Sequence, residues 1–94
     1  MPKFVTEIVG DEDYRYLPIG EHIVCAPEIC GGRPTFKYTG IEVAGVLAML
    51  ADGDTIDEIV EDYYGRISRE AILEAIQIAG KEVRKLRRRP KRAA

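Results

Sequence analysis

A chain of 94 residues, with 46% hydrophobic residues and a formal net charge of −2, is long enough for one domain but offers little scaffold for an elaborate second site. It has no run of about 18 apolar residues and no basic region leading into an apolar core near its N-terminus, so we expect neither a membrane span nor a signal peptide, and a cytoplasmic location. Two cysteines do not indicate a disulfide framework, and we expect reduced thiols.

Charge is distributed unevenly along the chain. Residues 1–79 carry 6 Lys and Arg against 15 Asp and Glu, whereas residues 80–94 carry 8 against 1, which together give −2. A tail of Lys and Arg can bind an anion, while an acidic body is repelled by a phosphate backbone. We therefore expect any contact with an anionic partner to come from the basic C-terminal residues rather than from the acidic body.

The first 25 residues have the pattern of short strands. Residues 4–9 and 14–19 are rich in side chains that favour strands, and the Gly and Asp residues between them supply turn chemistry, which predicts a β-hairpin. Pro18 lacks a backbone donor, so we expect it at a strand end or on a free edge. Residues 21–25 predict another short extended segment.

Residues 28–35 predict a compact loop of fixed shape. Gly31 and Gly32 allow positive φ angles, and Pro34 biases Arg33 towards an extended conformation. Arg33 is the side chain of this loop that we expect to contact a partner.

Three amphipathic helices are predicted between residues 41 and 79. Their apolar residues recur at helical spacing, so each helix has one face to bury. These residues are Val43, Val46, Leu47 and Leu50, then Ile56, Ile59, Val60 and Tyr63, then Ile72, Ile76 and Ala79.

The sequence also marks the ends of these helices. Thr39 with Glu42, and Thr55 with Glu58, fit the capping box, in which the Thr hydroxyl and the Glu carboxylate satisfy free amides at a helix start. Ser68 is the expected N-cap of the third helix. Helix ends are expected at Gly53 and Gly65, and the third helix can continue to about residue 88 before Pro90 ends it.

The chain resembles the domain of unknown function 433 family over about residues 21–82. The residues that carry the resemblance are Ile29-Cys30-Gly31-Gly32-Arg33-Pro34-Thr35, Thr39, Ile41, Val43, Val46-Leu47, Gly53, Asp57-Glu58-Ile59, Glu61-Asp62-Tyr63 and the run from Ala71 to Ala79. The resemblance implies a small helix-turn-helix fold, often dimeric, and in several cases an antitoxin role beside a PIN-type nuclease toxin. The family usually has Gly-Thr-Arg-Ile-Pro-Val where this chain has Tyr38-Thr39-Gly40-Ile41-Glu42-Val43, so Gly40 replaces the Arg and Glu42 replaces the Pro.

Residues for metal binding or catalysis are few. His22, Cys25 and Cys30, even with Glu28 added, do not form the two closely spaced ligand pairs of a structural zinc site, so we expect no metal. One His, one Ser and no Trp leave few ways to assemble a nucleophile, a base and an orienting group. We therefore expect a non-enzyme with no catalytic residues and no cofactor.

DNA binding has arguments on both sides. In a helix-turn-helix the second helix of the pair enters the major groove, where its N-terminal residues meet base edges. The candidate DNA contacts are Arg66, Ser68 and Arg69 at the helix start, with Lys81, Arg84, Lys85 and Arg88 further along. Glu70 and Glu74 oppose an approach to phosphates, and Glu61 stands where a tight turn prefers a small residue. The cations also fit a solvated helix end.

The third helix carries the spacing of a coiled-coil seam. Ile72, Ile76, Ala79, Val83 and Leu86 are separated by 4, 3, 4 and 3 residues. We expect the part up to Ala79 to pack on the domain, and the set Ile76, Ala79, Val83 and Leu86 to form a face for a second copy or a partner protein. The alternative is that the N-terminal hairpin folds back over this face.

Together these features predict an α+β fold that is mainly α. It consists of an N-terminal β-hairpin extension (residues 1–20), a three-helix module of helix-turn-helix or homeodomain-like type (residues 21–82) and a basic helix end with a tail (residues 83–94). The expected function is a small non-catalytic regulator, antitoxin-like and homodimeric, that binds a PIN-like nuclease toxin and operator DNA. The alternative is a protein-interaction or structural homodimer module that binds no DNA.

Overall fold

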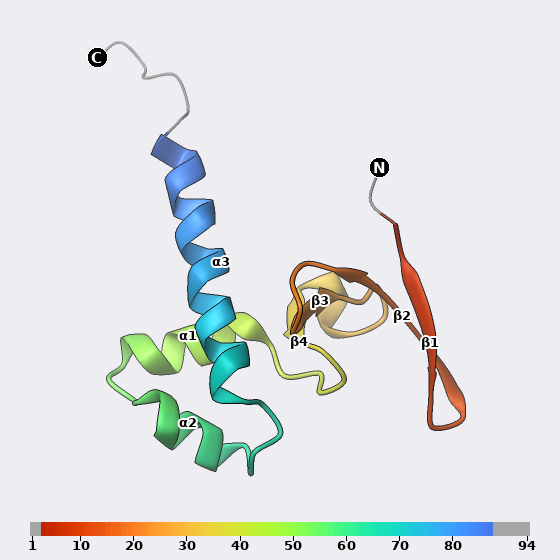
Figure 1. The fold of residues 1–94 in the computed structure, drawn as a ribbon, viewed down its shortest axis with the longest axis horizontal. Helices are drawn as coiled ribbons and strands as arrows, with labels where there is room; N and C mark the ends of the chain where they lie inside the picture. Colours follow the sequence, from red (N-terminus) through yellow and green to blue (C-terminus); the bar gives the residue numbers. More distant parts are fainter. Residues whose placement is uncertain (1–2, 88–94) are drawn as a thin grey trace.

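A four-stranded antiparallel sheet precedes three helices in the computed structural model, which describes residues 3–87 (Figure 1). The strands lie side by side in chain order, and a single 3-10 turn, η1 (Cys30–Gly32), precedes the last of them. This is a small α+β fold. Its elements are β1 (Val5–Val9), β2 (Glu12–Pro18), β3 (Ile23–Cys25), β4 (Pro34–Phe36), α1 (Val43–Ala51), α2 (Ile56–Asp62) and α3 (Arg69–Arg87).

The predicted N-terminal hairpin is confirmed. β1 pairs with β2 from Val5 opposite Tyr16 to Val9 opposite Glu12, which leaves a two-residue turn. Gly10 opens that turn with a φ of 64°, a left-handed value that Gly adopts without strain. Pro18 is the last residue of β2, at a strand end as expected.

The predicted loop of residues 28–35 is wrong at its end, because Pro34 begins strand β4. β4 pairs with β3, with Ile23 opposite Phe36 and Val24 opposite Thr35. The φ angles at Gly31 and Gly32 are 63° and 83°, so the two glycines supply the turn that brings the chain back beside β3.

The helix starts agree with the sequence in two of three cases. At α2 the predicted capping box is present, and at α3 the hydroxyl of Ser68 accepts a hydrogen bond from the amide of Ala71. At α1 the predicted box is wrong. Thr39 instead donates its hydroxyl to the carbonyl of Phe36, and Glu42 is the N-cap residue without a side-chain capping bond. Thr39 thus stabilises the turn before the helix rather than its first amides.

The two faces of the sheet bury different side chains. Ile23 and Phe36 point to the helices and join a core with Val46, Ile59 and Ile72. On the opposite face a smaller cluster contains Tyr16, Val24 and Ala26. Adjacent strand residues such as Ile23 and Val24 therefore serve different cores, as the alternation of a strand requires. None of the helices in residues 3–87 is long and apolar enough to cross a membrane.

Candidate partner and nucleic-acid interface

Helix α3 packs on the domain with its first half only. Ala71, Ile72 and Ala75 are buried against the core, and Ile78 is partly buried beside it. The small alanines allow the helix to approach the other elements closely. Ile76 is 41% exposed, so the expectation that the seam from Ile72 to Ala79 packs inwards is wrong at this residue.

The second half of α3 extends past the end of the domain (Figure 1). Val83 and Leu86 are 60% and 58% exposed there, so the alternative in which the N-terminal hairpin covers this face is wrong. In Figure 1, β3 and β4 lie between the hairpin of β1 and β2 and helix α3. We call the set Ile76, Ala79, Val83 and Leu86 the α3 stripe.

An apolar groove adjoins the α3 stripe at the point where the helix leaves the domain. Its volume is about 240 Å³, and it lies between α1, α3 and the residues after β2. Ala79 belongs to both the groove and the stripe. The groove is lined chiefly by Ile19, Val43, Leu47, Ala75, Ile78 and Ala79. Groove and stripe together offer a larger apolar surface than either does alone.

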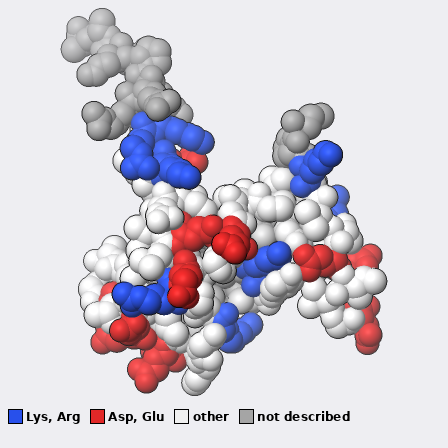
Figure 2. Space-filling model, in the orientation of Figure 1, with Lys and Arg blue, Asp and Glu red and all other residues white. Residues whose placement is uncertain are grey.

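Three of the predicted cationic contacts lie on the projecting half of α3, on the side of the helix turned away from the stripe, because a helix turns by about 100° per residue. Lys81, Arg84 and Lys85 are exposed on the projecting half of α3, where Figure 2 shows a cluster of blue side chains. Lys85 also lies 3.2 Å from Glu82, an exposed pair that contributes little to stability. Arg88 lies outside the described residues.

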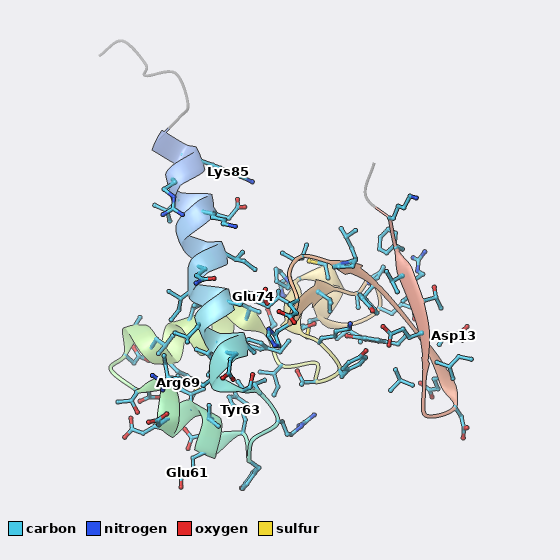
Figure 3. All side chains as sticks on the ribbon, viewed as in Figure 1. Asp13, Glu61, Tyr63, Arg69, Glu74 and Lys85 are labelled. Atoms are coloured by element: carbon cyan, nitrogen blue, oxygen red, sulfur yellow. The ribbon has the colours of Figure 1, made fainter. Side chains whose placement is uncertain are left out.

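The predicted base-reading residues make contacts within the chain instead. Arg69, labelled in Figure 3, pairs with Asp57 of α2 at 2.9 Å, and Arg66 donates to the carbonyl of Thr39 at 3.2 Å. Ser68 caps α3, as described above. Arg69 lies about 24 Å from Lys85 along the helix axis, at 1.5 Å per residue, and Arg66 and Ser68 precede the helix. The structure therefore does not bring the two groups of predicted DNA contacts together.

Glu74 has a structural contact that the sequence does not reveal. Its two carboxylate oxygens accept hydrogen bonds from the amides of Glu21 and His22 at 2.8 and 2.7 Å, and it lies 3.4 Å from the His22 ring. Burial raises the pKa of Glu74. The hydrogen bonds from the two amides and the His22 ring together lower the pKa by more than burial raises it, so the pKa lies below its ordinary value. Figure 3 shows Glu74 on the side of α3 that faces the sheet.

Arg33, the predicted loop contact, forms an ion pair at one end of the groove. Its Nε lies 2.7 Å from Oε2 of Glu42, and its side chain remains 61% exposed. The hydrogen bond from Arg33 lowers the pKa of the Glu42 carboxyl. Arg33 therefore remains accessible to a partner, although the carboxylate of Glu42 already neutralises its charge.

The comparisons with known proteins place this arrangement in a family. The family model described as "Protein of unknown function (DUF433)" matches residues 23–79. The chain belongs to the DUF433 family. Neither the curated proteins nor the solved structures gave a match.

The DUF433 match begins at β3 and stops midway along α3. It contains η1, β4, α1 and α2, and thus most of the helix-facing core. The N-terminal hairpin and the projecting half of α3 lie on either side of the matched range. The α3 stripe therefore starts inside the family region with Ile76 and continues beyond it to Leu86.

A polar cluster that sequence reasoning missed joins the N-terminal hairpin to the residues that follow β4. Glu7 accepts hydrogen bonds from the hydroxyls of Tyr16 and Tyr38, and Lys37 lies 3.6 Å from its carboxylate. The hydrogen bond from Tyr16 is the largest cause that lowers the pKa of Glu7. Lys37 also lies over the Tyr16 ring at 4.9 Å. No short-range pattern joins these residues, because Glu7 and Tyr16 come from paired strands of the hairpin and Lys37 and Tyr38 come from the segment after β4.

The residues considered as metal ligands do not assemble. Within residues 3–87, no group of three or more His, Cys, Asp or Glu side chains is arranged to hold a metal ion. Cys25 and Cys30 are free thiols, and burial raises the pKa of Cys25. The candidate site is the exposed surface composed of the α3 stripe, the adjoining groove and the cations on the projecting half of α3.

Proposed function

We propose that this DUF433 protein is a small, non-catalytic cytoplasmic regulator that binds a partner protein through the α3 stripe, as an antitoxin binds its toxin. The observation that carries the proposal is the exposure of Val83 and Leu86 on a helix that extends past the domain. Apolar side chains at helical spacing, exposed beside a groove, are typical of a helix that docks onto another protein.

The cations of α3 stay accessible when the stripe is covered. Lys81, Arg84 and Lys85 lie on the side of the helix turned away from the stripe, since a helix turns by about 100° per residue, so a protein docked on the stripe leaves them facing solvent. A partner helix with an apolar face would cover the stripe and extend into the adjoining groove. In the antitoxin-like interpretation, a PIN-like nuclease supplies that helix.

Co-expression with the product of the adjacent reading frame tests this proposal. We expect that frame to encode a small nuclease with clustered acidic residues, which co-purifies with the full chain and is inhibited by it. The double variant Val83→Asp with Leu86→Asp should lose the complex. Tyr64→Asp is the matched control, because Tyr64 is almost fully exposed in the turn between α2 and α3. Equal binding by both variants would contradict a role for the stripe.

DNA binding is a second candidate function, favoured by the three exposed cations of α3. In this candidate function, α2, the turn after it and α3 act as a helix-turn-helix. The three helices then form a mainly helical, homeodomain-like module. Arg66 and Arg69 are however engaged within the chain, and Asp57 and Glu61 add negative charge to α2. These contacts favour phosphate binding by the cations over groove reading.

Titration of a random-sequence duplex across a salt series tests the DNA candidate. The triple variant Lys81→Gln, Arg84→Gln and Lys85→Gln should reduce the slope of log K against log salt by up to about 2.7, because each phosphate contact contributes about 0.9. The pair Arg66→Gln and Arg69→Gln should leave the slope unchanged. Absence of binding by the full chain at low salt would remove DNA from the proposed function.

A further inference from the structure

Strand β1 is an unprotected edge of the sheet. It pairs with β2 on one side only, and among residues 3–87 no backbone hydrogen bond joins its outer side to another part of the chain. Natural edge strands are commonly blocked by Lys, Pro or a bulge, because free edges pair with other chains. The β1 sequence Val-Thr-Glu-Ile-Val contains neither Lys nor Pro, and its pairing with β2 is continuous.

The outward backbone groups of β1 can be assigned from the hairpin register. In a hairpin with a two-residue turn, the residues next to the turn form a hydrogen-bonded pair, and bonded and non-bonded pairs then alternate. Val9, Glu7 and Val5 therefore bond to β2. The amides and carbonyls of the intervening residues, Thr6 and Ile8, point to the free edge.

The exposed side chains of this edge are apolar and are spaced symmetrically. Ile8 is 76% exposed and Phe4 is 47% exposed, and each lies two residues from Thr6. The guanidinium of Arg15, opposite Thr6 on β2, lies 4.7 Å from the centre of the Phe4 ring. This face of the hairpin therefore presents an aromatic ring and a β-branched side chain to solvent, on either side of a small residue.

We propose that β1 pairs antiparallel with β1 of a second copy of the chain, in a register centred on Thr6. This register places Phe4 opposite Ile8 of the second copy, Val5 opposite Glu7, and Thr6 opposite itself. Aromatic and β-branched residues form favourable cross-strand pairs, and no two like charges stand opposite one another. The bonded positions also match, because Thr6 and Ile8 carry the free backbone groups.

A neighbouring register is less favourable. If the pairing is centred on Glu7, the same backbone groups bond, but the Glu7 carboxylates of the two chains stand directly opposite each other, which is destabilising. Ile8 then faces Thr6 rather than Phe4, so the two exposed apolar residues are not paired. Of these two registers, the side chains therefore favour the one centred on Thr6.

The surface proposed here is separate from the α3 stripe. β1 is the outermost strand on one side of the molecule, and the projecting half of α3 lies on the other (Figure 1). Strand pairing would join two sheets into one of eight strands and leave both α3 stripes accessible. The pairing does not depend on the proposed partner binding, so either proposal can fail without the other.

Light scattering of the full chain across a concentration series tests the pairing. We expect a monomer–dimer equilibrium that reaches the dimer mass at high concentration, because a single strand pair buries a modest area. Thr6→Pro removes an amide that points to the free edge and should give a monomer at every concentration. Thr6→Val is the matched control and should dimerise like the wild type. A wild-type chain that stays monomeric, or a dimer that survives Thr6→Pro, would overturn the proposal.

Cross-linking then tests the register. Residues that face each other in a bonded antiparallel pair have Cα atoms about 5.5 Å apart, within the range of a disulfide. A Thr6→Cys chain should therefore form an intermolecular disulfide between the two introduced thiols under mild oxidation, identified by mass spectrometry. Ile8→Cys is the control and should form no such link, because residue 8 faces residue 4 of the other copy. The opposite result would overturn the Thr6-centred register, even if the chain dimerises.

Discussion

Glu74 fixes α3 to the turn between β2 and β3. It lies 52 residues from His22 in the sequence, yet its carboxylate accepts the amides of both His22 and Glu21. Gly20 leaves room for this contact, since a Cβ at that position would lie 2.6 Å from one carboxylate oxygen. From the sequence alone Glu74 is one of the charges that oppose DNA, whereas in the structure it joins α3 to the turn that precedes β3.

Removal of this carboxylate should destabilise the fold. Glu74→Ala leaves two amides without their acceptor, and hydrogen bonds to charged groups are each worth about 1.5–3 kcal/mol. We expect a loss near the lower value, because the site is partly exposed and water can replace the carboxylate. Glu74→Gln retains one acceptor oxygen and should lose less. Urea unfolding measures both, with Glu28→Gln, at an exposed position outside the helices, as a control that should leave the free energy of unfolding nearly unchanged.

The same residue predicts a pH dependence. The pKa of Glu74 is lower in the folded chain than its ordinary value of 4.5, so the folded state binds this proton less readily than the unfolded state. The stabilisation is complete above that value and is lost as the pH falls through the folded pKa. Below about pH 4.5, the stability of Glu74→Gln should therefore fall less steeply than that of the wild type. Parallel curves for the two chains would contradict the assignment.

At the scale of single elements, α2 depends most on its cap. It has only seven residues, and its start is closed by reciprocal bonds, with the Glu58 amide to the Thr55 hydroxyl at 3.1 Å and the Thr55 amide to the Glu58 carboxylate at 2.8 Å. Thr55→Ala should cost about 1 kcal/mol of the free energy of unfolding. Thr55→Ser keeps the hydroxyl and should cost much less. Equal losses in thermal unfolding would show that the methyl group of Thr55, rather than its hydroxyl, matters.

The elements that could be predicted are those whose signals are local. The hairpin follows from Gly10 between two strand-like segments, and the caps at Thr55 and Ser68 lie within three residues of the amides they satisfy. Strand β4 could not be predicted, because its three residues follow a glycine pair and acquire a strand partner only when the chain turns back onto β3.

The inward face of α3 could not be predicted either. Both Ile72 and Ile76 fit a coiled-coil spacing, but the inward side of the helix is set by its contact with the sheet and α1. Small residues at positions 71 and 75 allow that contact, so Ala75 is buried and Ile76 is exposed. Which face of a helix is buried depends on the shape of the elements that it packs against. The spacing of apolar residues within one helix gives no information about that shape. The projecting end was predictable, since Val83 and Leu86 lie beyond what so small a domain can cover.

At the scale of the whole molecule, the stabilising core and the proposed binding surfaces occupy different places. The main core lies between β3, β4 and the three helices, within the DUF433 match. The β1 edge and the α3 stripe lie on extensions at opposite sides of it (Figure 1). Side chains on these surfaces contribute little to the free energy of unfolding, so they can be replaced without unfolding the chain. Substitutions that weaken binding can therefore be distinguished from substitutions that destabilise the fold.

Substitution at matched apolar positions along α3 tests that separation. Ile72 is fully buried, so Ile72→Ala removes packed methyl groups and should cost about 2–5 kcal/mol of the free energy of unfolding. Leu86 is 58% exposed on the same helix, and Leu86→Ala should change the free energy by no more than about 0.5 kcal/mol. Urea unfolding at low protein concentration keeps self-association out of the measurement. A large loss for Leu86→Ala would mean that the α3 stripe is part of the folded core of a single chain, and would remove the reason for assigning it to a partner.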